Sequence, residues 1–468
     1  MVPSANGSRW KWLASLAVLG VLLSSSAAWA VPRANDSGAS RLAQNYIERF
    51  YPRWFSHAQA RTAHIANPPG GNVLFGPDRV SPLYGAVVAI NVDTLYASAI
   101  VEPGSEPVIF TIPRTSVSYS LLTATNFGDV FDSGIPSGRP GTYALTAPDW
   151  HGELPGGVTR VDVPYRQSMW IIRGDKYSDG RNTVARAEQF RRNLRMATLS
   201  DYVANPDAGQ THVVPEATFG IRYKVIADNM VARAPIAFLR QLQTAVNDPE
   251  TAPLTRQDKA VAEEFDKIFG KGRNLPSELR DQFARGVRQG HARIIRNYLG
   301  HTTENNWVNF RNIGNWSARD YLDRSSIAEF LQWGNSLPTA AYWHTFKDTS
   351  GTALNGSSKG YVLTFPAGKL PETSRFWSLT AYTPHAVTLI PNVADTYAVA
   401  SYTPGLKKNP DGSLSIYLSR TRPTGVNPEN WIPVGNGEFN VMLRAYGPQG
   451  GTLSGSYVPP GITPLTGS

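Results

Sequence analysis

The sequence feature that most constrains the fold is a run of alternating apolar and polar residues near the C-terminus. Between residues 375 and 446, the segments FWSLTAY, SLSIYLS and EFNVMLRAY alternate with a period of two, which is the pattern of half-buried strands. The intervening NPDG at 409–412 contains Asp-Gly, which readily adopts the positive φ of a tight turn. The stretch therefore predicts a twisted antiparallel sheet with Trp, Tyr, Asn and Arg at its strand ends.

The order of patterns along the chain indicates the fold class. Helical spacing at 40–63 precedes short β-branched and aromatic runs between residues 84 and 173, among them VVAINVDTLYASAIV at 87–101. Helical periodicity returns at 183–199 and continues to about residue 335. Runs of strands followed by runs of helices favour an α+β fold over alternating βαβ units. We expect two antiparallel β-sandwich or barrel-like domains with a helical segment between them.

A chain of 468 residues is too long for one ordinary core, so more than one domain is expected. The patterns divide it into a signal peptide at 1–30, an N-terminal helix and loop at 31–83, a first β domain at 84–181, a helical segment at 182–338 and a second β domain at 339–468.

The first thirty residues have the pattern of an export signal. Arg9 and Lys11 precede an apolar run at 12–23, and Ala28-Trp29-Ala30 places small residues at −3 and −1, so cleavage is expected after Ala30. An uncleaved anchor is the alternative, but the run is shorter than the roughly 20 residues of a membrane span. We therefore expect a periplasmic or secreted protein without a stable membrane span after cleavage.

Composition excludes several classes of chemistry. The chain contains no Cys, which removes disulfides, thiolate nucleophiles and zinc–cysteine sites. Its net charge of +9 is spread out, so no nucleic-acid partner is expected. The eight His residues form no HxH or HExxH spacing, and no P-loop, GxGxxG or GxSxG motif occurs. Neither a metal site nor a cofactor is predicted, and the oligomeric state is left open.

Several motifs together resemble two families of unknown function. INVDTLYASAIV, EPVIFTIP, GTYALTAPDWHGELPGGV and VPYRQSMWIIRGDKYSDG resemble the Domain of Unknown Function 1254. FWSLTAY, the isolated Asn392, NPDGSLSIYLS, NWIPVG and FNVMLRAYGP resemble the Domain of Unknown Function 1214. The two domains occur together in exported bacterial proteins. The resemblance implies two β-sandwich-like or barrel-like domains with helices between them, and it implies no established reaction.

The first candidate site is the segment around Asn91, Asp93 and Tyr96. If 87–101 is one strand, Asn91 and Asp93 share a face, while Tyr96 lies on the other. An Asn-x-Asp pair could orient a ligand, and a partly buried Asp93 is the candidate catalytic base. The alternative is structural: a strand-entry turn in which Asn and Asp bond nearby backbone.

The second candidate site lies at the strand ends of the C-terminal β region. Tyr, Trp, Asn and Arg there can stack on a ligand and bond to it, and Arg can hold a carboxylate through two hydrogen bonds. In the structural alternative, Asn430 and Trp431 close a corner and Arg444 bonds a backbone carbonyl or a core acid. The candidate binding residues are Trp377, Tyr382, Asn392, Asn430, Trp431 and Arg444.

Two functions remain open from the sequence. The first is binding of a small molecule in a pocket at the strand ends of the β domains. The alternative is a hydrolase or lyase acting on a small exported or environmental compound. A pocket in which His, Asp and Arg from both β regions converge would favour the enzyme, whereas a lining of Trp, Tyr and aliphatic residues would favour binding.

Overall fold

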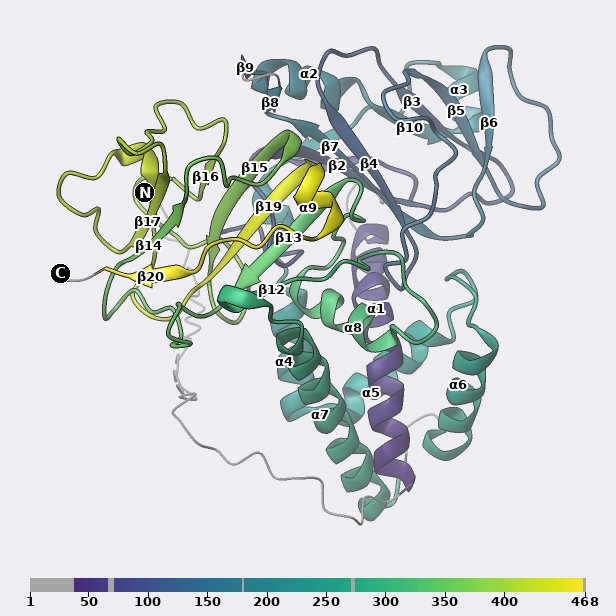
Figure 1. Ribbon diagram of the computed structural model, residues 1–468. Helices are drawn as coiled ribbons and strands as arrows, with labels where there is room; N and C mark the ends of the chain where they lie inside the picture. The colour runs from purple at the N-terminus through teal and green to yellow at the C-terminus, as the bar shows by residue number, and fades with distance from the viewer. Residues whose placement is uncertain (1–37, 66–70, 179–180, 271–273, 466–468) are drawn as a thin grey trace, which may run out of the picture. The chain divides into compact units, whose positions relative to one another are not determined.

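The computed structural model describes residues 38–65, 71–178, 181–270 and 274–465 (Figure 1). From Gly38 onward the chain forms one unit, which contains two β regions and a helical bundle. The predicted signal peptide lies outside the described residues and stays a prediction, as do the domain boundaries.

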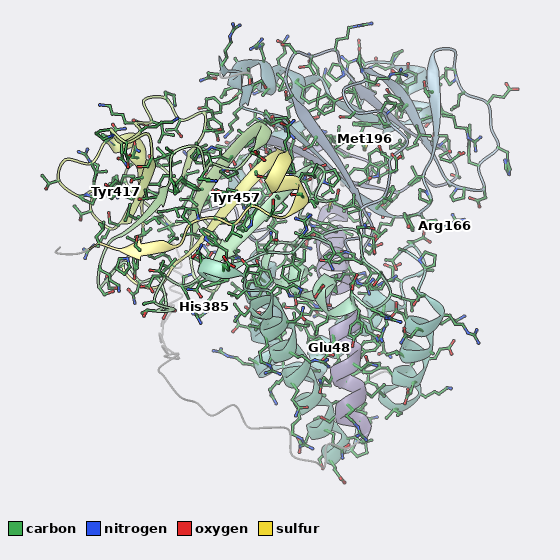
Figure 2. The ribbon with its side chains drawn as sticks, in the orientation of Figure 1. Glu48, Arg166, Met196, His385, Tyr417 and Tyr457 are labelled. Carbon is green, nitrogen blue, oxygen red and sulfur yellow. The ribbon has the colours of Figure 1, made fainter. Side chains whose placement is uncertain are left out.

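The first β region is a sandwich. Its two sheets have the strand orders β11-β1-β2-β7-β4 and β10-β3-β5-β6. Trp170 and Phe110, one from each sheet, lie with ring centres 5.9 Å apart in the core between them, and Met196 joins that core (Figure 2). The strands are β1 (Phe75–Pro77), β2 (Thr94–Val101), β3 (Val108–Ile112), β4 (Tyr119–Ala124), β5 (Gly141–Thr146), β6 (Val158–Asp162), β7 (Ser168–Asp175), β10 (Arg195–Thr198) and β11 (His212–Val214).

The second β region repeats this arrangement. Its sheets have the orders β12-β13-β19-β15-β16 and β18-β17-β14-β20. Alternate residues of the long strands, such as Trp377, Leu379 and Leu443, fill the core between the sheets, as the period-two pattern predicts. The strands are β12 (Trp307–Val308), β13 (Ala340–Thr345), β14 (Tyr361–Phe365), β15 (Thr373–Tyr382), β16 (Ala398–Ala400), β17 (Leu414–Ser419), β18 (Trp431–Pro433), β19 (Asn440–Pro448) and β20 (Ile462–Pro464).

The α+β prediction is confirmed, with two refinements. Most strand pairs are antiparallel, but β1 with β11, β5 with β6 and β17 with β18 are parallel. Each of these four sheets ends in edge strands within the described chain, so the regions are open sandwiches and not closed barrels. A small separate pair, β8 (Tyr177–Ser178) and β9 (Arg181–Asn182), is antiparallel.

The N-terminal helix predicted at 40–63 is α1 (Gly38–His64), and it packs with helices from the segment between the β regions. The first β region is therefore an insertion, in sequence, between helices that share one core. No helix in the described ranges is long and apolar enough to cross a membrane. The remaining helices are α2 (Val184–Asn193), α3 (Leu199–Ala204), η1 (Glu216–Phe219), α4 (Tyr223–Arg233), α5 (Pro235–Val246), α6 (Arg256–Phe269), α7 (Ser277–Gly300), η2 (Glu304–Asn306), α8 (Tyr321–Phe330), η3 (Pro428–Asn430) and α9 (Gly450–Ser454).

Two glycines of α7 allow the close approach of α1. A Cβ atom at Gly286 would lie 2.1 Å from the carbonyl oxygen of Ser40, and one at Gly290 would lie 2.3 Å from Ile47. Side chains at these positions would push the helices apart. Glycine is costly inside a helix, and here its small size permits the backbone contact that joins α1 to the bundle (Figure 1).

The two β regions and the helical bundle meet in a shared apolar cluster. It contains Tyr96 and Ile171 from the first region, Phe330 from α8, and Tyr342 and Tyr446 from the second region. The cluster also includes Tyr84, Val88 and Ile90 from the connection that leads into β2. This junction holds the cavity described below.

The strand predicted at 87–101 begins seven residues later, at Thr94, so Asn91 and Asp93 do not share a strand face. The Oδ1 of Asn91 accepts hydrogen bonds from the backbone N–H groups of Asp93 and Thr94 at 3.0 and 3.2 Å. Such a side-chain-to-backbone turn competes with strand pairing. Ala89, with φ of 51°, also departs from extended backbone. The alternation in VVAINVD therefore reflects a buried loop.

Candidate functional site

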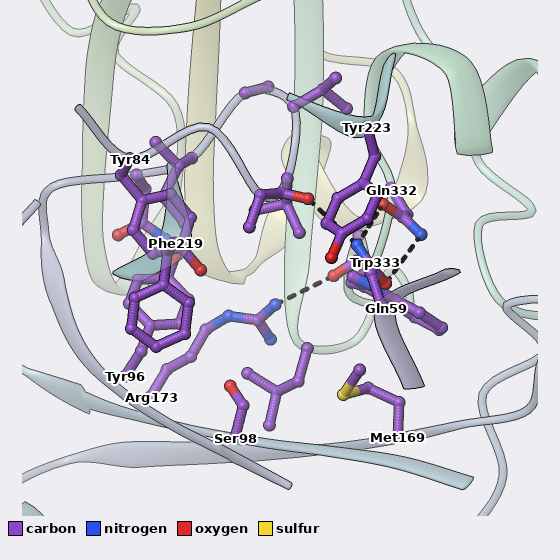
Figure 3. Close-up of a pocket in the computed structure, with 18 of the residues that line it drawn as sticks. Gln59, Tyr84, Tyr96, Ser98, Met169, Arg173, Phe219, Tyr223, Gln332 and Trp333 are labelled. Atoms are coloured by element: carbon purple, nitrogen blue, oxygen red, sulfur yellow. Dashed lines mark hydrogen bonds between the residues drawn. The ribbon is translucent and has the colours of Figure 1, made fainter. Parts of the chain in front are cut away.

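A cavity of about 200 Å³ lies at the junction of the three parts of the fold (Figure 3). Its walls come from α1, the connection before β2, strands β2 and β7, η1, the segment after α8, and strands β13 and β19. The exposed residues Thr218 and Ile221 belong to its rim. Segments far apart in sequence thus enclose one space.

Most of the lining is apolar. Aliphatic side chains and Met169 cover one part, and Phe75, Phe219 and Trp333 contribute aromatic surface. Gln59 accepts a hydrogen bond from Trp333 Nε1 at 3.0 Å and donates one to Gln332 at 3.1 Å (Figure 3). These amides are satisfied within the protein. An apolar surface with a few fixed polar groups is typical of a small-molecule site.

Arg173, on β7, points into the cavity (Figure 3). It is opposite Tyr96 on β2, and its guanidinium lies 5.5 Å from the centre of that ring. It donates to Asn335 Oδ1 at 2.8 Å and to the carbonyl of Trp333 at 2.9 Å. The side chain of Asn335 also donates to Tyr342 Oη at 3.0 Å. Arg173 is thus held in one orientation by neutral acceptors.

Arg444, on β19, is the second arginine of the lining and is 1% exposed. It donates to the carbonyl of Ala89 and, at 3.4 Å, to Thr380 Oγ1. Burial lowers the pKa of Arg444, but its interactions with Tyr382, Tyr446 and Asp93 more than offset this, so the pKa lies above its usual value. This arginine is therefore charged and has an acidic side chain near it.

The two carbonyls that accept from the arginines belong to residues with unusual backbone. Ala89 and Trp333 have φ of 51° and 59°, in the left-handed region that residues with a side chain rarely adopt. Such conformations persist where the surroundings hold them, and they concentrate at functional sites. Each arginine bonds one of these carbonyls, so the polar groups of the cavity also fix the shape of its walls.

Two tyrosine hydroxyls in the lining have no hydrogen-bond partner in the described chain. Tyr84 stacks on Phe219 with ring centres 5.2 Å apart, and burial raises the pKa of its hydroxyl. Tyr96 lies beneath the guanidinium of Arg173. Because both residues line the cavity, their hydroxyls are available to a bound molecule, in contrast to that of Tyr446, which accepts from Asn91 at 2.7 Å.

Two family models match this chain. The family model described as "Protein of unknown function (DUF1254)" matches residues 71–198, and the model "Protein of unknown function (DUF1214)" matches residues 339–450. This chain contains both domains, DUF1254 followed by DUF1214. The cavity takes Tyr96 and Arg173 from the DUF1254 domain and Tyr342 and Arg444 from the DUF1214 domain.

Solved structures of two other proteins are similar to this DUF1254–DUF1214 protein, and the first of them shares its fold. The VPA0106 protein from Vibrio parahaemolyticus has 21% identity and a TM-score of 0.57, and the match covers 92% of this chain and 100% of that one. An uncharacterised protein from Burkholderia cenocepacia has 14% identity and a TM-score of 0.43 over 91% of this chain and 94% of that one. No curated protein matches this chain.

The candidate residues from the sequence separate into three groups. Asn91, Tyr96 and Arg444 line the cavity. Tyr382 lies behind Arg444, whose guanidinium is 5.5 Å from its ring centre, and its hydroxyl donates to the carbonyl of Ile90 at 2.7 Å. The remaining candidates, Asp93, Trp377, Asn392, Asn430 and Trp431, do not belong to the lining.

The polar groups of the DUF1214 candidates outside the cavity bond within the protein. Asn392 closes a local turn through Thr396, and Asn430 bonds backbone groups of Lys407 and Ser415. Trp431 Nε1 donates to Ser419. Trp377 lies in the sandwich core against Phe365. These contacts correspond to the structural alternative for this group.

Asp93, the candidate base, is fully buried between the two domains. Its carboxylate accepts from Ser378 Oγ at 2.8 Å and from the hydroxyl of Tyr402, both in the C-terminal β region. Burial, together with the negative charge of Asp93, raises the pKa of Tyr402 well above its usual value. This geometry makes Asp93 an interdomain hydrogen-bond acceptor.

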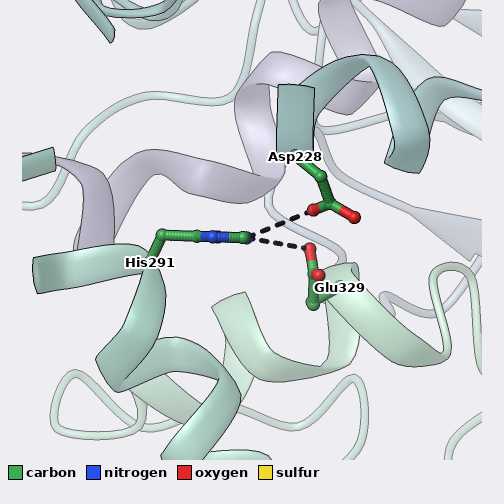
Figure 4. A group of neighbouring side chains, drawn as sticks. All are labelled: Asp228, His291 and Glu329. Atoms are coloured by element: carbon green, nitrogen blue, oxygen red, sulfur yellow. Dashed lines mark ion pairs between the residues drawn. The ribbon is translucent and has the colours of Figure 1, made fainter. Parts of the chain in front are cut away.

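A group of possible metal ligands lies in the helical bundle. Ligand atoms of Asp228, His291 and Glu329, from α4, α7 and α8, lie within 4.8 Å of one another (Figure 4). The ammonium of Lys224 bonds both carboxylates. Burial lowers the pKa of His291, but Glu329 and Asp228 raise it to about 9. Two cationic side chains therefore already neutralise the two acids, which fits a buried ionic cluster better than a metal centre.

Proposed function

We propose that this protein binds a small, largely apolar molecule in the cavity between its DUF1254 and DUF1214 domains. The observation that carries the proposal is the lining itself, which is mostly aliphatic and aromatic and contains a few oriented polar groups. Both domains and the helical bundle contribute to it, so a ligand would contact all three. Asn91, Tyr96 and Arg444 are the sequence-predicted residues that take part.

The lining favours binding over catalysis. Among the described residues that form it, none is His, Asp, Glu, Lys or Cys. A general base must come within hydrogen-bond reach of its substrate, and Asp93 instead bonds Ser378 and Tyr402. The hydrolase or lyase alternative therefore has less support than the binding function.

We also propose that binding takes place in the periplasm or outside the cell. The support is the sequence pattern of the first thirty residues: Arg9 and Lys11, an apolar run, and small residues before the expected cleavage site after Ala30. Fractionation of cells that express the full chain, with sequencing of the mature N-terminus, tests this location.

Titration with N-phenyl-1-naphthylamine, a neutral probe that fluoresces in apolar surroundings, tests the binding function. Ser98 lines the cavity from β2, and Ser98→Phe would fill part of that space with an aromatic ring. The matched control is Ser357→Phe, at an exposed position in the connection between β13 and β14.

We expect saturable probe fluorescence in the wild type and in Ser357→Phe, and its loss in Ser98→Phe. Circular dichroism establishes that both variants are folded. Absence of saturable fluorescence in the wild type would contradict the proposal, as would equal binding in a folded Ser98→Phe variant.

A further inference from the structure

We propose that the ligand of this cavity is an organic carboxylate, with its apolar body against the aliphatic and aromatic lining and its acid group on Arg173. This inference rests on the proposed binding function and specifies the chemistry of its ligand. It follows from charge, from geometry and from the polar groups that the protein leaves free.

The first argument is the charge of Arg173. Arg173 is 6% exposed, and it forms no ion pair with any carboxylate of the described chain. Both of its hydrogen bonds go to neutral oxygens. A buried charge without a counter-ion is costly. Arg49, Lys224 and Arg375, in contrast, each bond a buried carboxylate. A bound anion would supply the counter-charge that Arg173 lacks within the described chain.

Position distinguishes Arg173 from the other buried arginines. Arg53 also bonds only neutral oxygens, but it lies in the helical bundle and does not line the cavity. Arg444 does line it, but its cross-strand neighbour Ser378 donates to Asp93 at 2.8 Å, so a buried carboxylate lies near that guanidinium. Arg173 thus combines access to the cavity with an uncompensated charge.

The second argument is the geometry around the guanidinium. Asn335 and Trp333 fix its plane, and a guanidinium has five N–H donors, so donors remain for a ligand. A planar fork matches a carboxylate through two parallel hydrogen bonds. Tyr84 and Tyr96, whose hydroxyls have no partner in the described chain, lie within the same lining. A fixed cation with neutral donors beside it is suited to one acid group.

The apolar surroundings favour a monoanion over a phosphate. The lining contains two arginines and no lysine, and Arg444 has the carboxylate of Asp93 near it, through Ser378. One free guanidinium balances one negative charge, and each further charge would be buried without a partner at high cost. The carboxylates expected to bind are therefore those with an aliphatic or aromatic body and no second charge.

The test compares octanoate with 1-octanol, which has the same chain without the charge. Each displaces N-phenyl-1-naphthylamine from the full-length protein at pH 8. The key variant is Asn335→Asp, which is nearly isosteric and places a carboxylate against Arg173. Arg173→Met, which removes the cation, is the second variant.

We expect the wild type to bind octanoate about tenfold or more tightly than 1-octanol, since a hydrogen-bonded charge pair contributes at least that factor. In both variants octanoate affinity should fall by about tenfold or more, while 1-octanol affinity changes by less than about twofold. Retained 1-octanol binding shows that the cavity is intact.

If the wild type binds octanoate and 1-octanol with equal affinity, the ligand is not a carboxylate held by Arg173. The proposed binding function would still be supported by the binding of the neutral probe. Unchanged octanoate affinity in Asn335→Asp would lead to the same conclusions. If the probe itself does not bind the wild type, the proposed function fails together with this inference.

Discussion

Arg375 of the DUF1214 domain and Asp175 of the DUF1254 domain form a buried ion pair with two hydrogen bonds. Arg375 Nε donates to one carboxylate oxygen at 2.9 Å, and Nη2 donates to the other. The side chain of Asp175 is 1% exposed and that of Arg375 is 16% exposed. Close by, the carboxylate of Asp93 accepts a hydrogen bond from Ser378 of the DUF1214 domain. Charged contacts as well as apolar packing therefore join the two domains beside the cavity.

Arg375→Ala is expected to destabilise the protein by about 3–5 kcal/mol, because it leaves Asp175 buried without its partner. Urea unfolding, followed by intrinsic fluorescence, measures the change. The matched control is Arg166→Ala, which breaks an exposed ion pair with Asp149 and should change stability little. An equally small effect of both substitutions would show that the interdomain pair does not stabilise the fold.

The stability contributed by Asp175 should depend on pH. Burial raises the pKa of its carboxyl to about 6, with Arg375 opposing the shift and Asp93 adding to it. The folded protein therefore holds this proton more tightly than the unfolded chain, in which the pKa of Asp is about 3.9. The stability that the folded protein gains from this proton is fully present below about pH 4 and is lost as pH rises through about 6.

Asp175→Asn remains neutral throughout this range. The free energy of unfolding of the wild type, relative to that of Asp175→Asn, should fall by up to about 3 kcal/mol between pH 4 and pH 7. Urea unfolding of both proteins at four pH values measures it. If the difference between the two free energies of unfolding is constant or rises with pH, the pKa of Asp175 is not raised in the folded protein.

The ionic cluster in the helical bundle predicts a second pH dependence. Glu329 accepts from Tyr51 at 2.5 Å and pairs with Lys224 and His291. Burial alone would lower the pKa of His291, but Glu329 and Asp228 raise it to about 9. Stability from this protonated His is fully present below its unfolded pKa of about 6.5 and is lost as pH rises through about 9.

Glu329→Gln should lower the pKa of His291 and destabilise the protein, because the cations of His291 and Lys224 lose a buried counter-charge. NMR titration of the His ring protons follows the pKa directly. Asp228→Asn is the control, because Asp228 is partly exposed and its loss should lower the pKa less. A larger effect of Asp228→Asn would show that Glu329 is not the main partner.

Periodicity was enough to predict the fold class. Alternate residues of strands such as Thr373–Tyr382 and Leu414–Ser419 point into the sandwich core, as the local sequence pattern predicts. The prediction that these strands are half-buried was wrong, because their other face is buried as well. The same rule failed at Asn91 and Asp93, where a side-chain turn replaces the strand. It failed also at 183–199, where the predicted helix ends at Asn193 and the short strand β10 follows.

The candidate site could be predicted only in part. Arg444 was indicated by residue type at expected strand ends, but so were Asn430 and Trp431, whose bonds are internal. Tyr96 was indicated by its place in the segment that holds Asn91. Arg173 was missed because it lies in a mostly apolar strand that begins SMWIIRG, and its partner Asn335 is 162 positions away. His291, Asp228 and Glu329 come from three helices, so no ligand spacing shows in the sequence. Long-range contacts of this kind leave no local pattern.

The most direct measurement of the binding claim is the methyl NMR spectrum of protein labelled at its methionine methyl groups. Met169 lines the cavity, whereas Met196 lies in the first sandwich core, away from the lining. Met169→Leu assigns the reporting signal. During titration with octanoate, the signal of Met169 should shift saturably while that of Met196 stays in place. No shift at Met169, with octanoate in large excess over the protein, would contradict the binding of a carboxylate in this cavity.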